Sequence, residues 1–160
     1  FLGGGLVLDN QLVNGKTGNA GAIGSLPFYN GSTQSQLITQ SSLYLLERKL
    51  NDAGHNGQHI YESPSHWSCD TRSIEDWLSE TARGLAFATQ CAMSLLDLDG
   101  VIIDGAIPDD VKNALVAHTQ TAMETLDMRG LAQVHISEGL VGRKAQSIGS
   151  ANLALQANYY

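Results

Sequence analysis

Glycine is concentrated at the start of this chain, and that concentration limits what the first segment can fold into. The 160 residues include 17 glycines, and eight of them fall within residues 1–31. Gly3, Gly4 and Gly5 follow one another inside an aliphatic run typical of a strand. Glycine weakens a strand and leaves no side chain to pack, which indicates that something approaches the backbone closely. We expect either main-chain N–H groups wrapped around a phosphate or a tight hairpin or bulge.

Charge is scarce in the same part of the chain. Between residues 1 and 46 only Asp9 and Lys16 are charged. Such a segment offers backbone N–H groups and neutral hydrogen-bonding side chains to a ligand, but little acid–base chemistry. The whole chain carries a net charge of −7, which argues against a cationic face for nucleic acid. Any contact with DNA is therefore expected from a domain outside these residues.

Composition places the chain among globular proteins. The apolar fraction is 42% and the charged fraction 16%, and no apolar run is long enough to span a membrane. The two cysteines, Cys69 and Cys91, are far apart in sequence, which is typical of reduced thiols in a cytoplasmic protein. We expect a cytoplasmic location and no membrane partner.

Hydrophobic periodicity predicts an α/β chain that begins with strands and then alternates strands with helices. The predicted strands cover residues 2–8, 11–13, 22–28, 101–103 and 134–136, with a turn at Asp9-Asn10 and a polar loop over 29–35. The predicted helices cover residues 41–53, 73–95, 109–125 and 143–156, and residues 54–70 are irregular. This order favours a mixed sheet with helices on its faces.

The helix predicted over residues 73–95 has one apolar face and a good N-cap in Ser73. The face is formed by Ile74, Trp77, Leu78, Thr81, Leu85 and Ala88. Such a face usually packs in the core. A less favoured interpretation is that Trp77 and Phe87 serve oligomerisation.

Familiar catalytic motifs are missing from the sequence. Gly15-Lys16-Thr17 looks like the end of a phosphate-binding loop, but position 10 is Asn10 rather than the glycine that the motif needs. The three early glycines do not form a dinucleotide fingerprint either, because Leu8 stands where its next glycine would be. There is no evident nucleophile–base pair. We therefore predict no catalytic residue in this chain.

Two further groups of residues have open interpretations. His55, His59, His66 and Cys69 are of the right types for zinc, but their spacing matches no standard pattern, so exposed loop side chains are favoured over a metal site. Asp104 follows the short strand 101–103 and precedes Gly105. It either contacts a ligand at the carboxyl end of that strand or caps the following turn.

The glycine-rich start, read as a whole, resembles a known family signature. Residues 2–9 are followed by Leu12, Gly15 and the run Gly18-Asn19-Ala20-Gly21-Ala22-Ile23-Gly24. This resembles the ROK family (repressors, open reading frames and sugar kinases), whose pattern is a glycine-rich strand, a hairpin and Gly-x-Ala-Gly-Glu-x-Gly-His. The run 101–106 resembles the family's late strand ending in Gly-Gly, and residues 139–155 resemble its closing helix.

The resemblance implies a single C-terminal lobe, residues 1–160, of the actin-like ATPase fold, which has a ribonuclease-H-like core. The N-terminal lobe, the catalytic aspartate and any DNA-binding domain would lie upstream, and the abrupt start at Phe1 fits a fragment. It implies that nucleotide phosphates are contacted by Gly3, Gly4, Gly5, Asp104, Gly105 and Ala106. It also implies that the sugar-facing positions are Asn19, Ala22 and Ser25.

The departures from the family pattern affect its sugar and zinc ligands. Ala22 stands where the family has its sugar-binding glutamate, and Ser25 where it has a histidine that binds sugar and zinc. The zinc-binding cysteines have no counterpart between residues 25 and 42, and the family's Gly-Cys-Leu-Glu is Ser35-Gln36-Leu37-Ile38 here. Serine and glutamine cannot form a tetrahedral zinc site, so the family's zinc is predicted to be absent.

The chain is therefore most similar to zinc-less ROK transcriptional regulators. Its predicted role is a sugar-sensing or effector domain, with a sugar or sugar phosphate as effector, an upstream helix-turn-helix for DNA, and a homo-oligomeric state. The alternative is the C-terminal lobe of an ATP-dependent sugar kinase, which would need ATP and Mg²⁺. The 160 residues alone are predicted to be inactive, because phosphoryl transfer depends on positioning from both sides of a cleft.

Overall fold

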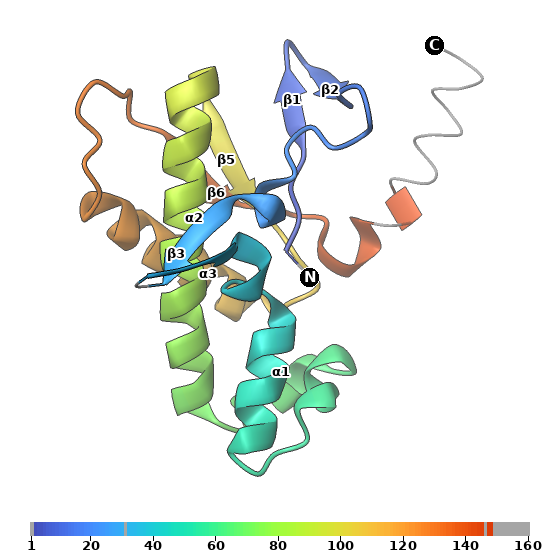
Figure 1. Ribbon diagram of the computed structural model, residues 1–160. Helices are drawn as coiled ribbons and strands as arrows, with labels where there is room; N and C mark the ends of the chain where they lie inside the picture. Colours follow the sequence, from blue (N-terminus) through green and yellow to red (C-terminus); the bar gives the residue numbers. More distant parts are fainter. Residues whose placement is uncertain (1, 31, 146, 149–160) are drawn as a thin grey trace.

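Helix α2 (Thr71–Leu96) is the longest helix described. The computed structural model describes residues 2–30, 32–145 and 147–148. The elements before α2 are β1 (Leu6–Leu8), β2 (Gln11–Val13), the 3₁₀ helix η1 (Ile23–Ser25), β3 (Pro27–Asn30), β4 (Thr33–Gln36), η2 (Leu37–Thr39), α1 (Leu43–Asp52), η3 (Gly57–Tyr61) and η4 (Pro64–Ser68). After it come β5 (Gly100–Ile103), α3 (Asp109–Glu124), β6 (His135–Glu138) and η5 (Gly142–Lys144). Helix α2 packs against α3 and α1, while the β1–β2 hairpin lies apart from it (Figure 1).

The predicted face of α2 is confirmed, since all six of its residues are buried. The helix begins two residues earlier than expected. Asp70 is the N-cap and accepts a hydrogen bond from the backbone N–H of Arg72 at 3.2 Å. Ser73 lies inside the first turn and donates its hydroxyl to Asp70 at 2.6 Å. Asp70 is therefore the residue that accepts from a free N–H group at the start of the helix, and Ser73 only donates to Asp70.

The strands form three separate two-stranded sheets among the described residues, so the prediction of one mixed sheet is wrong for this part of the chain. Strands β1 and β2 are antiparallel and meet at the expected turn, where Asp9 and Asn10 have φ values of 50° and 62°. Residues 2–5 are not strand, so the three glycines precede β1 rather than form it. Strands β5 and β6 are parallel.

The sequence predicted a strand over residues 22–28 and a loop over 29–35, but the structure has the β3–β4 hairpin there, over residues 27–36. Residues 23–25 form η1 instead of a strand, and the polar stretch predicted as a loop supplies β4. The two strands pair with Phe28 opposite Ser35. Phe28 packs edge-on against Phe87 of α2, with 5.5 Å between the ring centroids. A polar strand carries no hydrophobic alternation, which explains why the sequence pattern did not reveal it.

The core lies between α1, α2, α3 and the β5–β6 pair, and the segment predicted as irregular contributes to it. Residues 54–70 contain η3 and η4, whose Ile60 and Trp67 are buried. The indole N–H of Trp67 donates to the carbonyl of Ile60 at 3.0 Å, and that of Trp77 to Ser42 at 3.0 Å. Because Trp77 is buried and Phe87 packs on Phe28, both side chains are used inside the chain.

The end of the chain was predicted as a helix over residues 143–156. The structure shows a 3₁₀ turn at η5 and helical residues at 145 and 147–148. Residues 149–156 of that prediction lie outside the described part of the chain. Among the residues that are described, no helix has the length and apolar character needed to cross a bilayer.

Candidate functional site

The carboxyl ends of β5 and β6 lie side by side, because the two strands are parallel and pair with Ile103 opposite Glu138. Asp104 follows the first strand and Gly139 follows the second. The N–H of Gly139 continues the pairing by donating to the carbonyl of Ile103 at 2.8 Å. Ligands of open α/β sheets bind at such strand ends. This end of the pair is the first candidate site.

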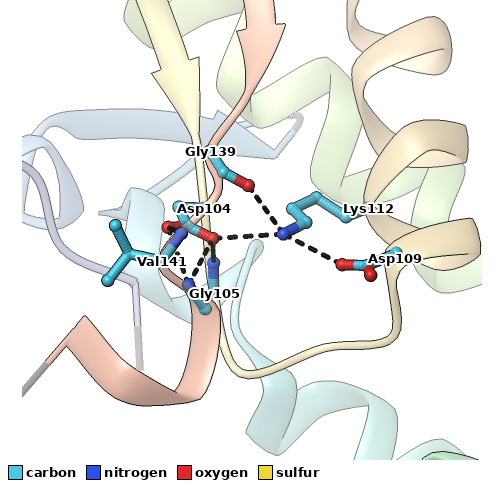
Figure 2. A network of polar contacts seen from close by, with 7 residues as sticks. Asp104, Gly105, Asp109, Lys112, Gly139 and Val141 are labelled. Atoms are coloured by element: carbon cyan, nitrogen blue, oxygen red, sulfur yellow. Dashed lines mark hydrogen bonds and ion pairs between the residues drawn. The ribbon is translucent and has the colours of Figure 1, made fainter.

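The carboxylate of Asp104 is surrounded by hydrogen-bond donors (Figure 2). The backbone N–H of Gly105 donates to it at 2.8 Å, that of Val141 at 3.1 Å and that of Gly142 at 3.0 Å. The ammonium group of Lys112 lies 3.4 Å from Oδ1. We call these three N–H groups and this ammonium the Asp104 cradle. The carboxylate thus ties the end of β5 to the turn that follows β6.

Lys112 is the member of the cradle that sequence reasoning missed. Its side chain is only 5% exposed, although it lies in the first turns of α3. Its ammonium donates to the carbonyl of Gly139 at 2.7 Å and lies 3.3 Å from Asp109 and 3.4 Å from Asp104. These three acceptors match the three donors of an ammonium, which makes burial of the charge tolerable. The one signal in the sequence is the i,i+3 spacing of Asp109 and Lys112.

Both charges of this pair are held in their ionised forms. Burial by itself would raise the pKa of Asp104, but the N–H groups of Gly142, Gly105 and Val141 and the Lys112 ammonium bring it below its usual range. Burial would lower the pKa of Lys112, but Asp109 and Asp104 raise it above the ordinary lysine value. The cradle is therefore a site built for a negative charge, and Asp104 supplies that charge.

Two glycines after β6 make room for this arrangement. A Cβ atom at Gly139 would lie 2.5 Å from both Cβ and Cγ of Asp104, so the site needs a residue without a side chain. Gly142 has a φ of 54°, a left-handed conformation that glycine adopts at little cost and that turns its N–H toward the carboxylate. The position of Asp104 thus explains why glycine occurs at both 139 and 142.

An open hollow of about 530 Å³ lies beside the cradle. It is lined by Pro64, Ile107, Pro108, Asp109, Asp110, Lys112, Leu140, Val141, Gly142, Arg143 and Lys144. Its rim carries both signs of charge. Of the residues predicted to contact nucleotide, Gly105 has its N–H engaged by Asp104, while Ala106 is exposed in the turn before α3. The structure therefore shows Asp104 engaged with Gly105 and with the turn after β6.

The three early glycines have different surroundings. A Cβ atom at Gly4 would lie 2.6 Å from the carbonyl oxygen of Gly21, so this glycine allows two backbone segments to pack together. Gly3 has open space around its missing side chain, and Gly5 has only Leu12 at 4.0 Å. Gly3 thus leaves its backbone accessible to a ligand. Gly4 serves packing, and the backbone of Gly5 lies against Gly21, whose Cβ would be 2.8 Å from the Gly5 carbonyl carbon.

The predicted sugar-facing residues share one exposed segment around η1. Asn19 donates from its amide to the Thr17 hydroxyl at 3.2 Å, Ala22 is the N-cap of η1, and Ser25 is its last residue. Helix η1 packs against η2, and a Cβ atom placed at Gly24 would lie 3.5 Å from the Cβ of Ile38. The fold thus brings the segment with Ala22 and Ser25 next to Ile38. These three side chains offer one hydroxyl and no carboxylate, imidazole or thiol.

The histidine-rich loop forms a separate small hollow of about 180 Å³, lined by His55, Asn56, His59, Ser65, His66, Ser68 and Cys69. The rings of His59 and His66 lie 5.0 Å apart, and His66 Nδ1 is 3.0 Å from the carbonyl of His59. The four residues considered for zinc therefore do come together. Even so, across residues 2–30, 32–145 and 147–148 no three His, Cys, Asp or Glu side chains are arranged to hold one metal ion.

Comparison with known proteins adds information at the level of structure only. No protein-family model and no curated protein matches the sequence. Solved structures do match. A ROK family protein from Streptococcus pneumoniae TIGR4, in complex with sucrose, aligns with a TM-score of 0.72 and 18% identity over 97% of this chain and 55% of its own. A ROK family glucokinase from Streptomyces griseus, in complex with glucose and AMPPNP, aligns with a TM-score of 0.72 and 20% identity over 96% of this chain and 57% of its own.

This chain has the fold of ROK proteins. A ROK family transcriptional regulator, a homologue of the E. coli MLC protein, also aligns, with a TM-score of 0.64 and 18% identity over 84% of this chain and 38% of its own. The resemblance seen in the sequence is thus matched by similar structures, and both kinases and a regulator are among them. The chain spans a little over half the length of the first of these structures.

Proposed function

We propose that this chain is the sugar-sensing lobe of a ROK-type transcriptional regulator, with the actin-like, ribonuclease-H-like lobe architecture. The observation that carries the proposal is the contact between η1 and η2, which places Ile38 beside Gly24, in the same short segment as Ala22 and Ser25. In the family pattern positions 22, 25 and 38 hold a glutamate, a histidine and a second glutamate. The scaffold is retained while the side chains that bind hexose and zinc are replaced. A lobe that senses a ligand needs the scaffold, but not the full catalytic set.

In this proposal the sugar lies against the exposed neutral segment around η1. Asn19 and Ser25 offer an amide and a hydroxyl to sugar hydroxyl groups, and Gly3 leaves its backbone accessible. A sugar phosphate is an equally suitable effector class for this segment. The net charge of −7 supports the view that DNA contacts belong to another domain of the whole protein, which acts as a cytoplasmic homo-oligomer.

The alternative is the C-terminal lobe of an ATP-dependent ROK sugar kinase. It is supported by the glucokinase structure, which aligns with 96% of this chain. Under this alternative ATP and Mg²⁺ would be held together with residues of another lobe, and Asp104, Gly105 and Ala106 would lie toward the nucleotide. The chain alone would still lack activity, because phosphoryl transfer requires positioning by both sides of the cleft.

Ligand binding and catalysis distinguish the two proposals on the full natural chain. Thermal-shift screening with hexoses and sugar phosphates is expected to reveal at least one ligand that raises Tm. In a coupled assay with the same sugars, no ADP release is expected. Hexose-dependent ADP release at ordinary kinase rates, about 1–100 per second, would overturn the regulator proposal in favour of the kinase.

Variants locate the sugar site. Asn19→Ala and Ser25→Ala should reduce the ligand-induced rise in Tm, because each removes a hydrogen-bonding group from the proposed site. Asn113→Ala on α3 and Ser79→Ala on α2 are matched controls, since both residues are exposed and distant in sequence from η1. An equal effect of the controls, or no effect of the site variants, contradicts this placement.

A further inference from the structure

We infer that Asp104 is a built-in anion that closes the β5–β6 strand end to nucleotide phosphates. The inference rests on the proposed function for the identity of the lobe, but it concerns a different part of the molecule from the sugar site. It predicts that the wild-type chain excludes phosphate groups from the Asp104 cradle. It also predicts that removing this one carboxylate creates a phosphate-binding site.

The first argument is the chemistry of the cradle. Three backbone N–H groups and one ammonium converge on a single point, which is the donor set that binds phosphate in many proteins. The donors come from segments far apart in sequence: the end of β5, the first turns of α3 and the turn after β6 (Figure 2). Asp104 already occupies all of them. A phosphate oxygen approaching the cradle would therefore meet a carboxylate instead of free donors.

The second argument is electrostatic. The N–H donors and Lys112 hold the Asp104 carboxylate in its charged form, so repulsion of a phosphate persists throughout the physiological pH range. The neighbouring hollow adds Asp109 and Asp110, whose negative charges oppose those of Arg143 and Lys144. With Asp104 in place the site carries no surplus positive charge for an anion. Without it, the buried Lys112 would remain with one fewer partner.

The third argument is space. Gly139 has no side chain, and the volume that its Cβ would fill is taken by Cβ, Cγ and Oδ2 of Asp104. Replacing Asp104 by glycine therefore leaves a gap between Gly139 and the donors, of which Lys112, Val141 and Gly142 line the hollow of about 530 Å³. A small oxyanion can enter from that side.

The test is calorimetric titration of the folded protein with inorganic phosphate and, separately, with ADP. Wild-type protein is expected to bind neither at the cradle. Asp104→Gly is expected to gain at least about tenfold in affinity for phosphate, and Asp104→Gly/Lys112→Met should lose that gain. Asp110→Asn is the matched control, because it removes one negative charge from the same hollow without emptying the cradle. An equal gain in Asp110→Asn, or phosphate binding by wild type that Asp104→Gly does not strengthen, overturns the inference.

Stability gives an independent measurement if Asp104→Gly folds poorly. At equal ionic strength, formate or phosphate should raise the Tm of this variant more than chloride does. For the wild-type protein, the Tm in formate or phosphate should equal the Tm in chloride. Asp104→Ser retains one acceptor for the cradle and should show a smaller anion effect. A variant that no anion stabilises counts against the inference, because the added anion should replace the carboxylate. Sugar binding by wild type is unaffected by these outcomes, so failure here and failure of the proposed function are separately visible.

Discussion

Lys112 and Asp104 form an ion pair of 3.4 Å that joins the first turns of α3 to the end of β5. The lysine also donates to the carbonyl of Gly139 at 2.7 Å, so one ammonium connects three segments of the chain. Its side chain is 5% exposed, whereas that of Asp104 is 25% exposed. Lys112 is thus more buried than Asp104, so its replacement removes polar contacts that water cannot restore.

Lys112→Met is expected to lower the free energy of unfolding by about 1–3 kcal/mol, because it leaves the Gly139 carbonyl without its donor and Asp104 without its cation. Methionine retains most of the side-chain volume, so the effect reports lost polar contacts. Lys49→Met is the control, since the Lys49–Glu80 pair is 32% and 41% exposed and should contribute less than about 1 kcal/mol. Denaturant unfolding measures both. Equal losses in the two variants would contradict the proposed difference.

Asp104 also predicts a pH dependence of stability. Its pKa is below the usual aspartate value when folded, so its stabilising effect is complete above the unfolded pKa of about 4 and is lost as pH falls through the folded pKa. Wild-type protein should therefore lose more unfolding free energy than Asp104→Asn between about pH 6 and pH 3. Asp70 and Asp127 also have lowered pKa values, but they contribute to both proteins and cancel in the difference. Parallel pH profiles would exclude this role.

The parts of the fold that were predictable from sequence are those with a strong local signal. The six apolar residues on one face of α2 recur at helical spacing, and all six are buried. The Asp9-Asn10 turn was recognisable because both residues tolerate a positive φ. In both places the local conformation that the residues prefer is the one that the tertiary structure contains.

The other two sheets could not be predicted in the same way. Strands β5 and β6 are far apart in sequence, so their parallel pairing depends on tertiary contacts that a local pattern does not show. Strand β4 is adjacent to β3 but consists of polar residues, so it lacks the apolar alternation that would predict a strand. The buried residues of α3 also include polar side chains that apolar spacing does not predict. Lys112 and Thr119 are buried, whereas His118 is only partly buried, since the burial of a lysine depends on partners that come from elsewhere in the chain.

The candidate site was predicted in part. Asp104 was recognised as either a ligand contact or a cap for the following turn, and the structure shows a wider internal role that reaches the turn after β6. That role requires Gly139 and Gly142, which lie more than thirty residues away in sequence. Only the parallel pairing of β5 with β6 brings these glycines to Asp104.

Gly139→Ala tests whether this glycine makes room for Asp104. The added methyl group would lie 2.5 Å from the Asp104 side chain, so we expect a loss of about 1–3 kcal/mol in unfolding free energy. Gly105→Ala is the control, because its Cβ would have only Ile107 at 4.0 Å. In an Asp104→Gly background the Gly139→Ala penalty should largely disappear, which a double-mutant cycle measures. Additive penalties would show that the two positions do not compete for space.

Gly84 is the one glycine in α2, and it lets the η2–α1 junction approach the helix closely. A Cβ there would clash with the hydroxyl of Ser41 and lie 2.8 Å from Leu37 Cδ1. Gly84→Ala should therefore destabilise the protein by about 1–3 kcal/mol, although alanine is the better helix former by about 1 kcal/mol.

Ser41→Ala provides the matched test of the Gly84 contact. The Ser41 hydroxyl is buried and has no hydrogen-bond partner among the described residues, so its removal should be close to neutral. It also removes the atom nearest to the new methyl group, so the Gly84→Ala penalty should be smaller in the Ser41→Ala background. Thermal and denaturant unfolding of the four proteins gives the coupling free energy. If Gly84→Ala stabilises the protein in the wild-type background, helix propensity outweighs packing at this position and the close approach is not required.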